Sequence, residues 1–205
     1  MSNTPHVFLI ATTNQHKKRE FARILAPLGI EIRTADELGV TLPEVEENGS
    51  TFEENALLKA RSGCAVSGVP TLSDDSGLCV DALDGAPGIY SARYSSDDGD
   101  NGDDEANNRK LLRELEDVPY EKRTAHYACA VASVFPDGRE RTTYGECQGK
   151  IGYEERGQNG FGYDPLFLIN DDETFAEVAP EVKDEQSHRS VALHHMYDVL
   201  KGDLE

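Results

Sequence analysis

A polar loop near the start of the chain has the residue types that bind phosphate groups. It has the sequence Thr12-Thr13-Asn14-Gln15-His16-Lys17 and lies between an apolar segment and a helical pattern. A strand that leads into a helix presents backbone N–H groups and the positive end of the helix dipole, which favour an anion. The Thr and Asn side chains can add hydrogen bonds, and Lys17 can reach a phosphoryl oxygen. The loop lacks the glycines of Walker and Rossmann motifs, and helix capping before a solvated basic turn is the alternative.

Two pairs of adjacent carboxylates offer ligands for a divalent cation. Glu46-Glu47 precede a predicted helix, and Asp74-Asp75 lie in an apolar context. Mg²⁺ prefers oxygen ligands, and one or two carboxylates with phosphates and water complete its octahedron. A carboxylate beside such a cation could orient or deprotonate an attacking water. Because the chain has 39 acidic residues, either pair could instead belong to the solvated surface.

A third group of residues has the chemistry to bind a nucleobase. Glycine in Phe161-Gly162-Tyr163-Asp164 lets backbone and ring approach a flat ligand closely, and Asp164 could bond to a base or hold the loop. Lys183, His188 and Arg189 form a cationic cluster suited to a phosphate or to a carbonyl acceptor on a base. The alternative is a loop entering a strand, with a core phenylalanine and helix-capping residues. Together the three groups match the parts needed by a nucleotide-triphosphate hydrolase.

Alternating helical and strand patterns predict an α/β fold that positions these groups. We expect one domain over residues 1–205, with a mixed β-sheet flanked by helices. The capping box Thr51-x-x-Glu54 predicts a helix, and Pro136-Asp137-Gly138 predicts the turn of a β-hairpin. We also expect a short helix capped by Asn107. Further strands are predicted over 6–11, 71–73, 78–80 and 166–169, with Asp74-Asp75-Ser76-Gly77 as a turn, and a closing helix from about Ser190.

The composition excludes several classes of protein. The chain has 205 residues, with 20 Lys and Arg against 39 Asp and Glu, which gives a formal net charge of −19. Such an acidic chain is a poor candidate for nucleic-acid binding, which needs a basic surface. No apolar run is long enough to span a membrane, so we expect a cytoplasmic protein. Six carboxylates lie within residues 97–105, and with the net charge they suggest a host with a salty cytoplasm.

The four cysteines are far apart and include no C-x-x-C pair. A structural zinc site is therefore not expected, and reduced, mostly buried thiols are the better interpretation.

Five motifs in order resemble those of the inosine triphosphate pyrophosphatase family, the XTP/dITP diphosphatases. The first two are ATTNQHKKRE, from Ala11 to Glu20, and TFEENALLKA, from Thr51 to Ala60. The longest runs from Ser73 to Tyr94, and the last two are FGYDPLF and KDEQSHR. The resemblance implies Mg²⁺-dependent hydrolysis of ITP, dITP and XTP to the monophosphate and pyrophosphate, which cleanses the nucleotide pool. It also implies an elongated sheet with two lobes, a cleft between them, and a homodimer.

The resemblance further implies roles for the residues that could bind the triphosphate and the metal. Thr12, Asn14 and Lys17 would hold the triphosphate, with Lys59 entering from the second motif. Asp75 would be linked to the metal and activate water, with Asp74 beside it. Glu46 would be a further metal ligand, although Glu47 next to it leaves that assignment uncertain by one position.

The remaining implied contacts are with the substrate and its base. Ser76 would contact the substrate, Phe161 to Asp164 would line the base pocket, and Lys183, His188 and Arg189 would complete it. Selectivity for a 6-oxo purine follows if the pocket offers donors where adenine presents its own amino group, since a buried unpaired donor costs about 1–3 kcal/mol. We hypothesise that His188 and Arg189, through side chain or backbone, supply these donors.

Two other functions are compatible with parts of this pattern. A Maf-type pyrophosphatase has a similar fold but prefers other nucleotides, and the FGYDP and SHR motifs argue against it. A non-catalytic nucleotide sensor would keep the pocket and lose turnover, yet Asp75, Lys17 and Lys59 are all present. The enzyme is therefore the interpretation that we carry forward.

Overall fold

The computed structural model describes residues 6–96 and 103–204, so most of the predicted acidic stretch over 97–105 lies outside the described residues. The strands are β1 His6–Ile10, β2 Ile30–Arg33, β3 Thr71–Val80, β4 Thr124–Val134, β5 Glu140–Ile151 and β6 Phe167–Leu168. The helices are α1 Gln15–Leu25, α2 Ala35–Leu38, α3 Phe52–Ser67, α4 Asp104–Glu114, α5 Pro180–Gln186 and α6 His188–Leu204. Short 3₁₀ segments are Ala26–Leu28, Asp81–Leu83, Gly88–Arg93 and Tyr120–Lys122.

The six strands form one mixed sheet in the order β2-β1-β3-β4-β5-β6. β1 is parallel to both β2 and β3, whereas β5 and β6 are antiparallel. This arrangement confirms the predicted α/β fold with helices around a mixed sheet. The predicted hairpin is also confirmed, since the N–H of Phe135 donates to the carbonyl of Arg139 at 2.9 Å between β4 and β5.

The chain divides into two compact units. Unit 1 comprises the described parts of Met1–Asp75, Cys129–Gly145 and Arg189–Glu205. Unit 2 comprises the described parts of Ser76–Ala128 and Glu146–His188.

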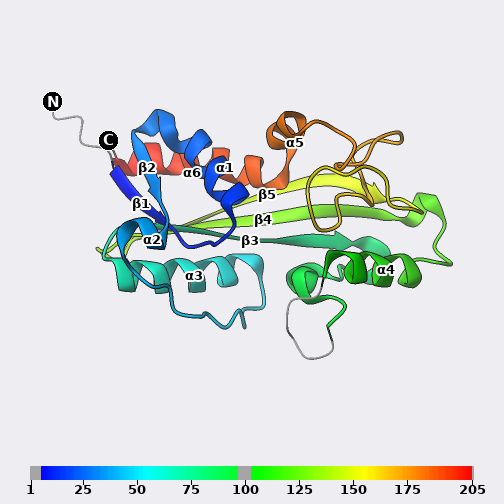
Figure 1. Cartoon of the computed structure of the whole chain (residues 1–205), viewed down its shortest axis with the longest axis horizontal. Coiled ribbons are helices and arrows are strands. Elements are labelled where there is room, and N and C mark those ends of the chain that lie inside the picture. Colours follow the sequence, from blue (N-terminus) through cyan, green and yellow to red (C-terminus); the bar gives the residue numbers. More distant parts are fainter. Residues whose placement is uncertain (1–5, 97–102, 205) are drawn as a thin grey trace. The chain divides into compact units, whose positions relative to one another are not determined.

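The core of unit 1 lies on one face of its strands, under α1 and α6. Phe8, Ile10 and Leu72 point into this core because alternate residues of a strand face the same side. Phe21 and Leu25 of α1 meet them at helical spacing. Figure 1 shows α1 and α6 on one side of these strands and α3 on the other.

The opposite face of the unit 1 strands is covered by α3. A Cβ added at Gly63 would lie 2.8 Å from Cγ2 of Thr71, so glycine permits this close approach. The hydroxyl of Ser73 donates to the carbonyl of Ala56 at 2.5 Å. The predicted cap is confirmed, since Thr51 Oγ1 accepts from the N–H of Glu54 at 3.2 Å. These contacts hold α3 along the odd-numbered residues of β3.

One sequence-based prediction is wrong at β3. We expected two short strands separated by a turn at Asp74-Asp75-Ser76-Gly77, but β3 is one strand of ten residues. Asp, Ser and Gly have low strand propensity, and tertiary contacts override that propensity here. The carboxylates of Asp74 and Asp75 are both paired with cations in unit 1, which allows them to remain in an extended, buried segment.

Unit 2 has its own core, formed by the apolar residues Leu78, Val80, Leu111, Leu115, Ala125, Tyr127, Ile151, Tyr163, Leu166, Phe167, Phe175 and Val178. The predicted cap of α4 is corrected by the structure: Asp103, not Asn107, caps it by accepting from the N–H of Ala106. Asn107 lies inside the helix, and its buried side chain accepts from the N–H of Ser95 at 2.8 Å.

All four cysteines are free thiols, as the sequence predicted. Across residues 6–96 and 103–204, none of the helices has the length and apolar character to span a bilayer.

Candidate active site

The predicted phosphate-binding loop joins β1 to α1 in unit 1. Thr12 Oγ1 accepts from the N–H of Asn14 at 3.1 Å, and Asn14 Oδ1 accepts from the N–H of Lys17 at 3.3 Å. These bonds hold the loop and cap the first turn of α1. The capping interpretation is therefore correct for Asn14, and it leaves the N-terminal end of the helix dipole in place for an anion.

A pocket of about 520 Å³ lies against this loop, within unit 1. It is lined by Ala11, Thr12, Thr13, Lys17, Leu42, Pro43, Glu44, Val45, Glu47, Lys59, Ser62 and Asp74. The sequence had identified Thr12, Thr13, Lys17, Lys59 and Asp74 from three separate motifs, and the fold brings them to one pocket.

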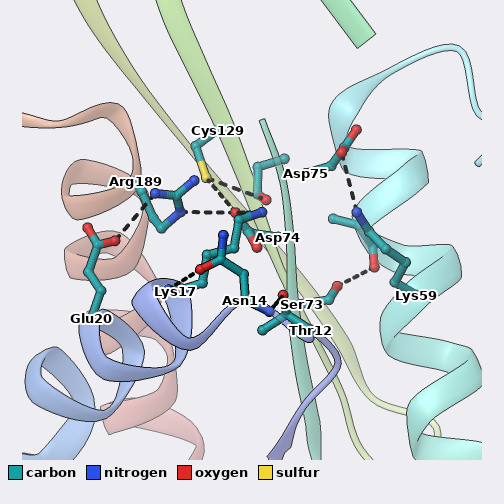
Figure 2. Close-up of polar contacts among 12 residues, drawn as sticks. Thr12, Asn14, Lys17, Glu20, Lys59, Ser73, Asp74, Asp75, Cys129 and Arg189 are labelled. Atoms are coloured by element: carbon teal, nitrogen blue, oxygen red, sulfur yellow. Dashed lines mark hydrogen bonds and ion pairs between the residues drawn. The ribbon is translucent and has the colours of Figure 1, made fainter. Parts of the chain in front are cut away.

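Asp74 lies at the centre of a buried charge cluster on one face of β3 (Figure 2). Its Oδ2 is 2.9 Å from Lys17 Nζ and 3.0 Å from Arg189 Nε. Arg189 Nη1 also lies 3.4 Å from Glu20 Oε2. The thiol of Cys129 is 3.9 Å from the same Asp74 oxygen. The carboxylate is thus surrounded by partners and almost fully excluded from solvent.

The electrostatics keep Asp74 ionised. Burial alone would raise its pKa, but the charges of Lys17, Arg189 and Lys59 outweigh burial and hold the pKa well below its usual range. Burial likewise opposes the charge of Arg189, yet Asp74 and Glu20 raise the pKa of the guanidinium above its usual value. Asp74 and Arg189 therefore both carry their charges at neutral pH.

Asp75 projects from the opposite face of β3 toward α3. Its Oδ1 is 3.3 Å from Lys59 Nζ, and its Oδ2 accepts from the amide of Asn55 at 3.2 Å. Burial raises the pKa of Asp75 to about 6, and the negative charge of Glu47 adds to this while Lys59 opposes it. Burial lowers the pKa of Lys59, but Asp75, Asp74 and Glu47 reverse this and raise it.

The two neighbouring carboxylates therefore have pKa values moved in opposite directions. Such a separation is typical of carboxyl pairs in which one group keeps a fixed charge and the other exchanges protons. Asp75 is half ionised near pH 6 and is suited to accept a proton from water at neutral pH. Asp74 is suited to hold Lys17 and Arg189 in place.

Glu46 and Glu47 occupy different surroundings in the structure. Glu47 lines the pocket, and its Oε2 is 3.1 Å from Lys59 Nζ. Glu46 is exposed and does not line the pocket. The residue that the structure places beside Lys59 and Asp75 is thus Glu47, one position after the predicted ligand.

A divalent cation has suitable donors here, although no complete cage. Within the described residues, no group of three or more His, Cys, Asp and Glu side chains converges on a point. The carboxylates of Glu47 and Asp75 instead converge on the ammonium of Lys59. Two carboxylates suit Mg²⁺ when phosphates and water supply its other ligands, so this donor set fits the ion.

The predicted base-binding loop belongs to unit 2. Phe161 is 47% exposed, whereas Tyr163 and Asp164 are buried. Asp164 Oδ2 accepts from the N–H of Phe161 at 2.9 Å and pairs with Lys183. Lys183 Nζ also lies 4.8 Å from the centre of the Phe161 ring. Of the two roles considered for Asp164, the structure shows the one that holds the loop.

Three other residues were predicted to contact the substrate, and each has different surroundings in the structure. His188 is buried in unit 2, where its ring stacks on Tyr127 at a centroid distance of 4.8 Å. Ser76 is half-buried in the same unit. The guanidinium of Arg189 lies in unit 1 with Asp74 and Glu20.

Sequence reasoning missed Glu20 and Asn55 as parts of the site. Both lie in motifs that it had identified, and their spacing was a usable signal. Glu20 follows Lys17 by three residues, and Asn55 precedes Lys59 by four, so each pair shares one helix face.

Comparisons with known proteins match this chain over nearly all of its length. The sequence profile of the Ham1 family matches residues 8–199. A dITP/XTP pyrophosphatase from Geobacter sulfurreducens is 51% identical over 193 residues, which cover 94% of this chain and 95% of the relative. A dITP/XTP pyrophosphatase from Bacillus subtilis is 43% identical over 195 residues, which cover 95% of this chain and 96% of that relative.

Solved structures show the same similarity. A HAM1 protein from Coxiella burnetii has a TM-score of 0.85 and 37% identity, covering 96% of this chain and 98% of that one. A nucleoside-triphosphatase / dITP/XTP pyrophosphatase from Mycobacterium abscessus has a TM-score of 0.77 and 42% identity, covering 95% and 99%.

Proposed function

Because the chain belongs to the Ham1 family, we propose that it is a dITP/XTP pyrophosphatase that hydrolyses dITP, ITP and XTP to the nucleoside monophosphate and pyrophosphate. The observation that carries the chemistry is the placement of Asp75: its carboxylate lies 3.3 Å from Lys59, and Lys59 lines the pocket and also contacts Glu47. A carboxylate held beside a phosphate-binding lysine can orient a water molecule and accept its proton.

The reaction divides among the unit 1 residues as follows. Asp75 accepts a proton from a water molecule while the water oxygen attacks the α-phosphorus. The bond between the α-phosphorus and the oxygen that bridges it to the β-phosphorus breaks, and pyrophosphate leaves with that oxygen. Lys17 and Lys59 bind the phosphate oxygens and stabilise the charge that develops on them. Thr12 and Thr13 line the same pocket and hold the triphosphate chain.

Glu47 and Asp75 would hold Mg²⁺, which would neutralise phosphate charge when bound. This proposal is supported by the oxygen donors that face Lys59 and by the resemblance of the motifs.

The purine would be recognised by the base-binding residues predicted from the sequence. Phe161 exposes a ring that can stack on a base, and the Lys183–Asp164 pair fixes the loop that carries it. We retain backbone N–H groups of His188 and Arg189, with the His188 ring, as candidate donors to the 6-oxo group. Stacking is worth about 1–3 kcal/mol per base, so Phe161→Ala should raise KM for ITP about 5- to 150-fold with a smaller change in kcat.

The experiment that tests this function is product analysis with ITP, dITP, XTP, ATP and GTP, each with Mg²⁺ and with EDTA. We expect monophosphate and pyrophosphate from the first three, little turnover of ATP and GTP, and none with EDTA. Release of orthophosphate, or equal turnover of ATP, would contradict the proposal. Nucleotide binding without turnover would favour a sensor.

The resemblance also supports a homodimer that cleanses the nucleotide pool of the cytoplasm. Light scattering coupled to size exclusion would test the dimer, with a mass near twice 22.5 kDa as the expected result.

A further inference from the structure

Asn55 is a fully buried amide in the first turn of α3. Its Nδ2 donates to Asp75 Oδ2 at 3.2 Å, and its Oδ1 accepts from the backbone N–H of Gly49 at 2.8 Å. A backbone N–H can only donate, so the Gly49 bond fixes which end of the amide faces Asp75. The amide therefore always presents a donor to the carboxylate.

Asn55 and Lys59 are four residues apart on one face of α3, and they hold different oxygens of the same carboxylate. Asn55 binds Oδ2, whereas Lys59 lies against Oδ1. Lys59 also contacts Glu47 and lines the pocket, so substrate phosphates would compete for its ammonium. The Asn55 amide is an uncharged donor and does not line the pocket, so substrate phosphates would not compete for it as they would for Lys59.

Asn55 also holds the loop that carries Glu47. Gly49 approaches so closely that an added Cβ would lie 2.7 Å from Asn55 Oδ1. Glu47 precedes Gly49 by two residues and reaches Lys59. The contacts form a closed ring through Asp75, Lys59, the Glu47–Gly49 segment and Asn55.

We propose that Asn55 is a positioning residue for the hydrolysis: it fixes the orientation of the Asp75 carboxylate, with Oδ2 held and Oδ1 left to act, and it sets the Glu47 loop against it. This inference rests on the proposed function of Asp75. Loss of a side chain that orients a ligating or catalytic group typically costs about 10- to 100-fold in activity.

The test compares Asn55→Asp with Glu54→Ala. Asn55→Asp keeps the acceptor for Gly49 but replaces the donor to Asp75 with a second carboxylate. Glu54→Ala is the matched control, because it removes the carboxylate that accepts from the backbone N–H and the hydroxyl of Ser50 in the same loop, and it leaves the contacts of Asp75 in place. We expect Asn55→Asp at pH 8 to lower kcat for ITP about 10- to 100-fold with KM near the wild-type value. Glu54→Ala should lower Tm and keep kcat.

Crystal structures of both variants give a readout that does not depend on turnover. The Asp75 carboxylate should rotate away from its wild-type orientation in Asn55→Asp and keep it in Glu54→Ala. If Asn55→Asp does not fold, Asn55→Ala is used in its place for both the kinetic and the structural comparison.

Unchanged kcat and unchanged Asp75 orientation in the Asn55 variant would overturn the inference. An equal loss of kcat in Glu54→Ala would also overturn it, because Asn55 would then only stabilise the loop. A wild-type protein without turnover would instead overturn the proposed function, and the orientation of Asp75 in the variants would still decide the role of Asn55.

Discussion

Asp74 and Asp75 are adjacent in the chain, but their surroundings differ on the two faces of β3. The face toward α1 and α6 gives Asp74 two cations within 3.0 Å and keeps its pKa well below the usual range. The face toward α3 gives Asp75 one lysine shared with Glu47, and its pKa rises to about 6. Strand alternation alone separates the two groups. A single strand can therefore carry a structural charge and a reactive one at consecutive positions.

The largest expected difference between substitutions at Asp75 and at Asp74 is in the turnover number. Asp75→Asn removes the proposed proton acceptor and should lower kcat by about 10²- to 10⁴-fold. Steady-state hydrolysis of ITP measures this loss. Circular dichroism must show a folded variant for the comparison to hold, and a kcat within tenfold of wild type would assign the proton to another group.

The same substitution at the neighbouring residue, Asp74→Asn, should act mainly on the free energy of unfolding. Asp74→Asn leaves the buried Arg189 with Glu20 as its remaining carboxylate and removes the partner of the partly exposed Lys17. Breaking a buried pair typically costs about 3–5 kcal/mol. Urea unfolding at pH 7 measures the change. The contribution of Asp74 is present above its usual pKa and is lost as pH falls, because its folded-state pKa is depressed. A loss below 1 kcal/mol would contradict the structural role.

Asp75→Asn should have the opposite effect on stability. A carboxyl whose pKa rises from 3.8 to about 6 on folding binds more protons in the folded state within that window, so stability falls as pH rises through it. Above pH 6 the ionised group costs about 3 kcal/mol. Asp75→Asn should recover much of that cost at pH 8 and little of it at pH 4. Destabilisation at pH 8 would show that the Lys59 pair outweighs burial.

The smallest expected effect sharpens the comparison between the two faces. Glu47 raises the pKa of Asp75, whereas the largest charge effects on the pKa of Asp74 come from Lys17, Arg189 and Lys59. Glu47→Gln should therefore lower the pKa of Asp75 and leave Asp74 ionised as before. NMR titration of the side-chain carboxyl carbons without metal measures both. Equal shifts at the two residues would show that they behave as one coupled pair.

The sequence predicted the local elements that carry the candidate site residues better than the contacts that surround those residues. Capping signals and helical spacing predicted α3 and placed Lys59 on it, and the motifs identified Asp74 and Asp75. These features depend on local spacing, which a sequence contains directly.

Features that depend on distant contacts were not predictable in the same way. The Asp-Asp-Ser-Gly segment has a composition typical of a turn. It is part of a strand because Lys17, Lys59 and Arg189, which come from other elements, pair with its carboxylates. The position of the Arg189 guanidinium depends on Glu20, which lies 169 residues away in the chain. The choice between Glu46 and Glu47 depends on which side chain reaches Lys59.

The most direct test of this account is a carbon-detected NMR titration of Asp74 and Asp75 in the wild-type protein, without metal or nucleotide, from pH 3 to pH 9. Asp75 should titrate near pH 6, and Asp74 should remain ionised throughout. Titration of both carboxyl groups near pH 4 would contradict the division of the two residues into a fixed charge and a proton acceptor.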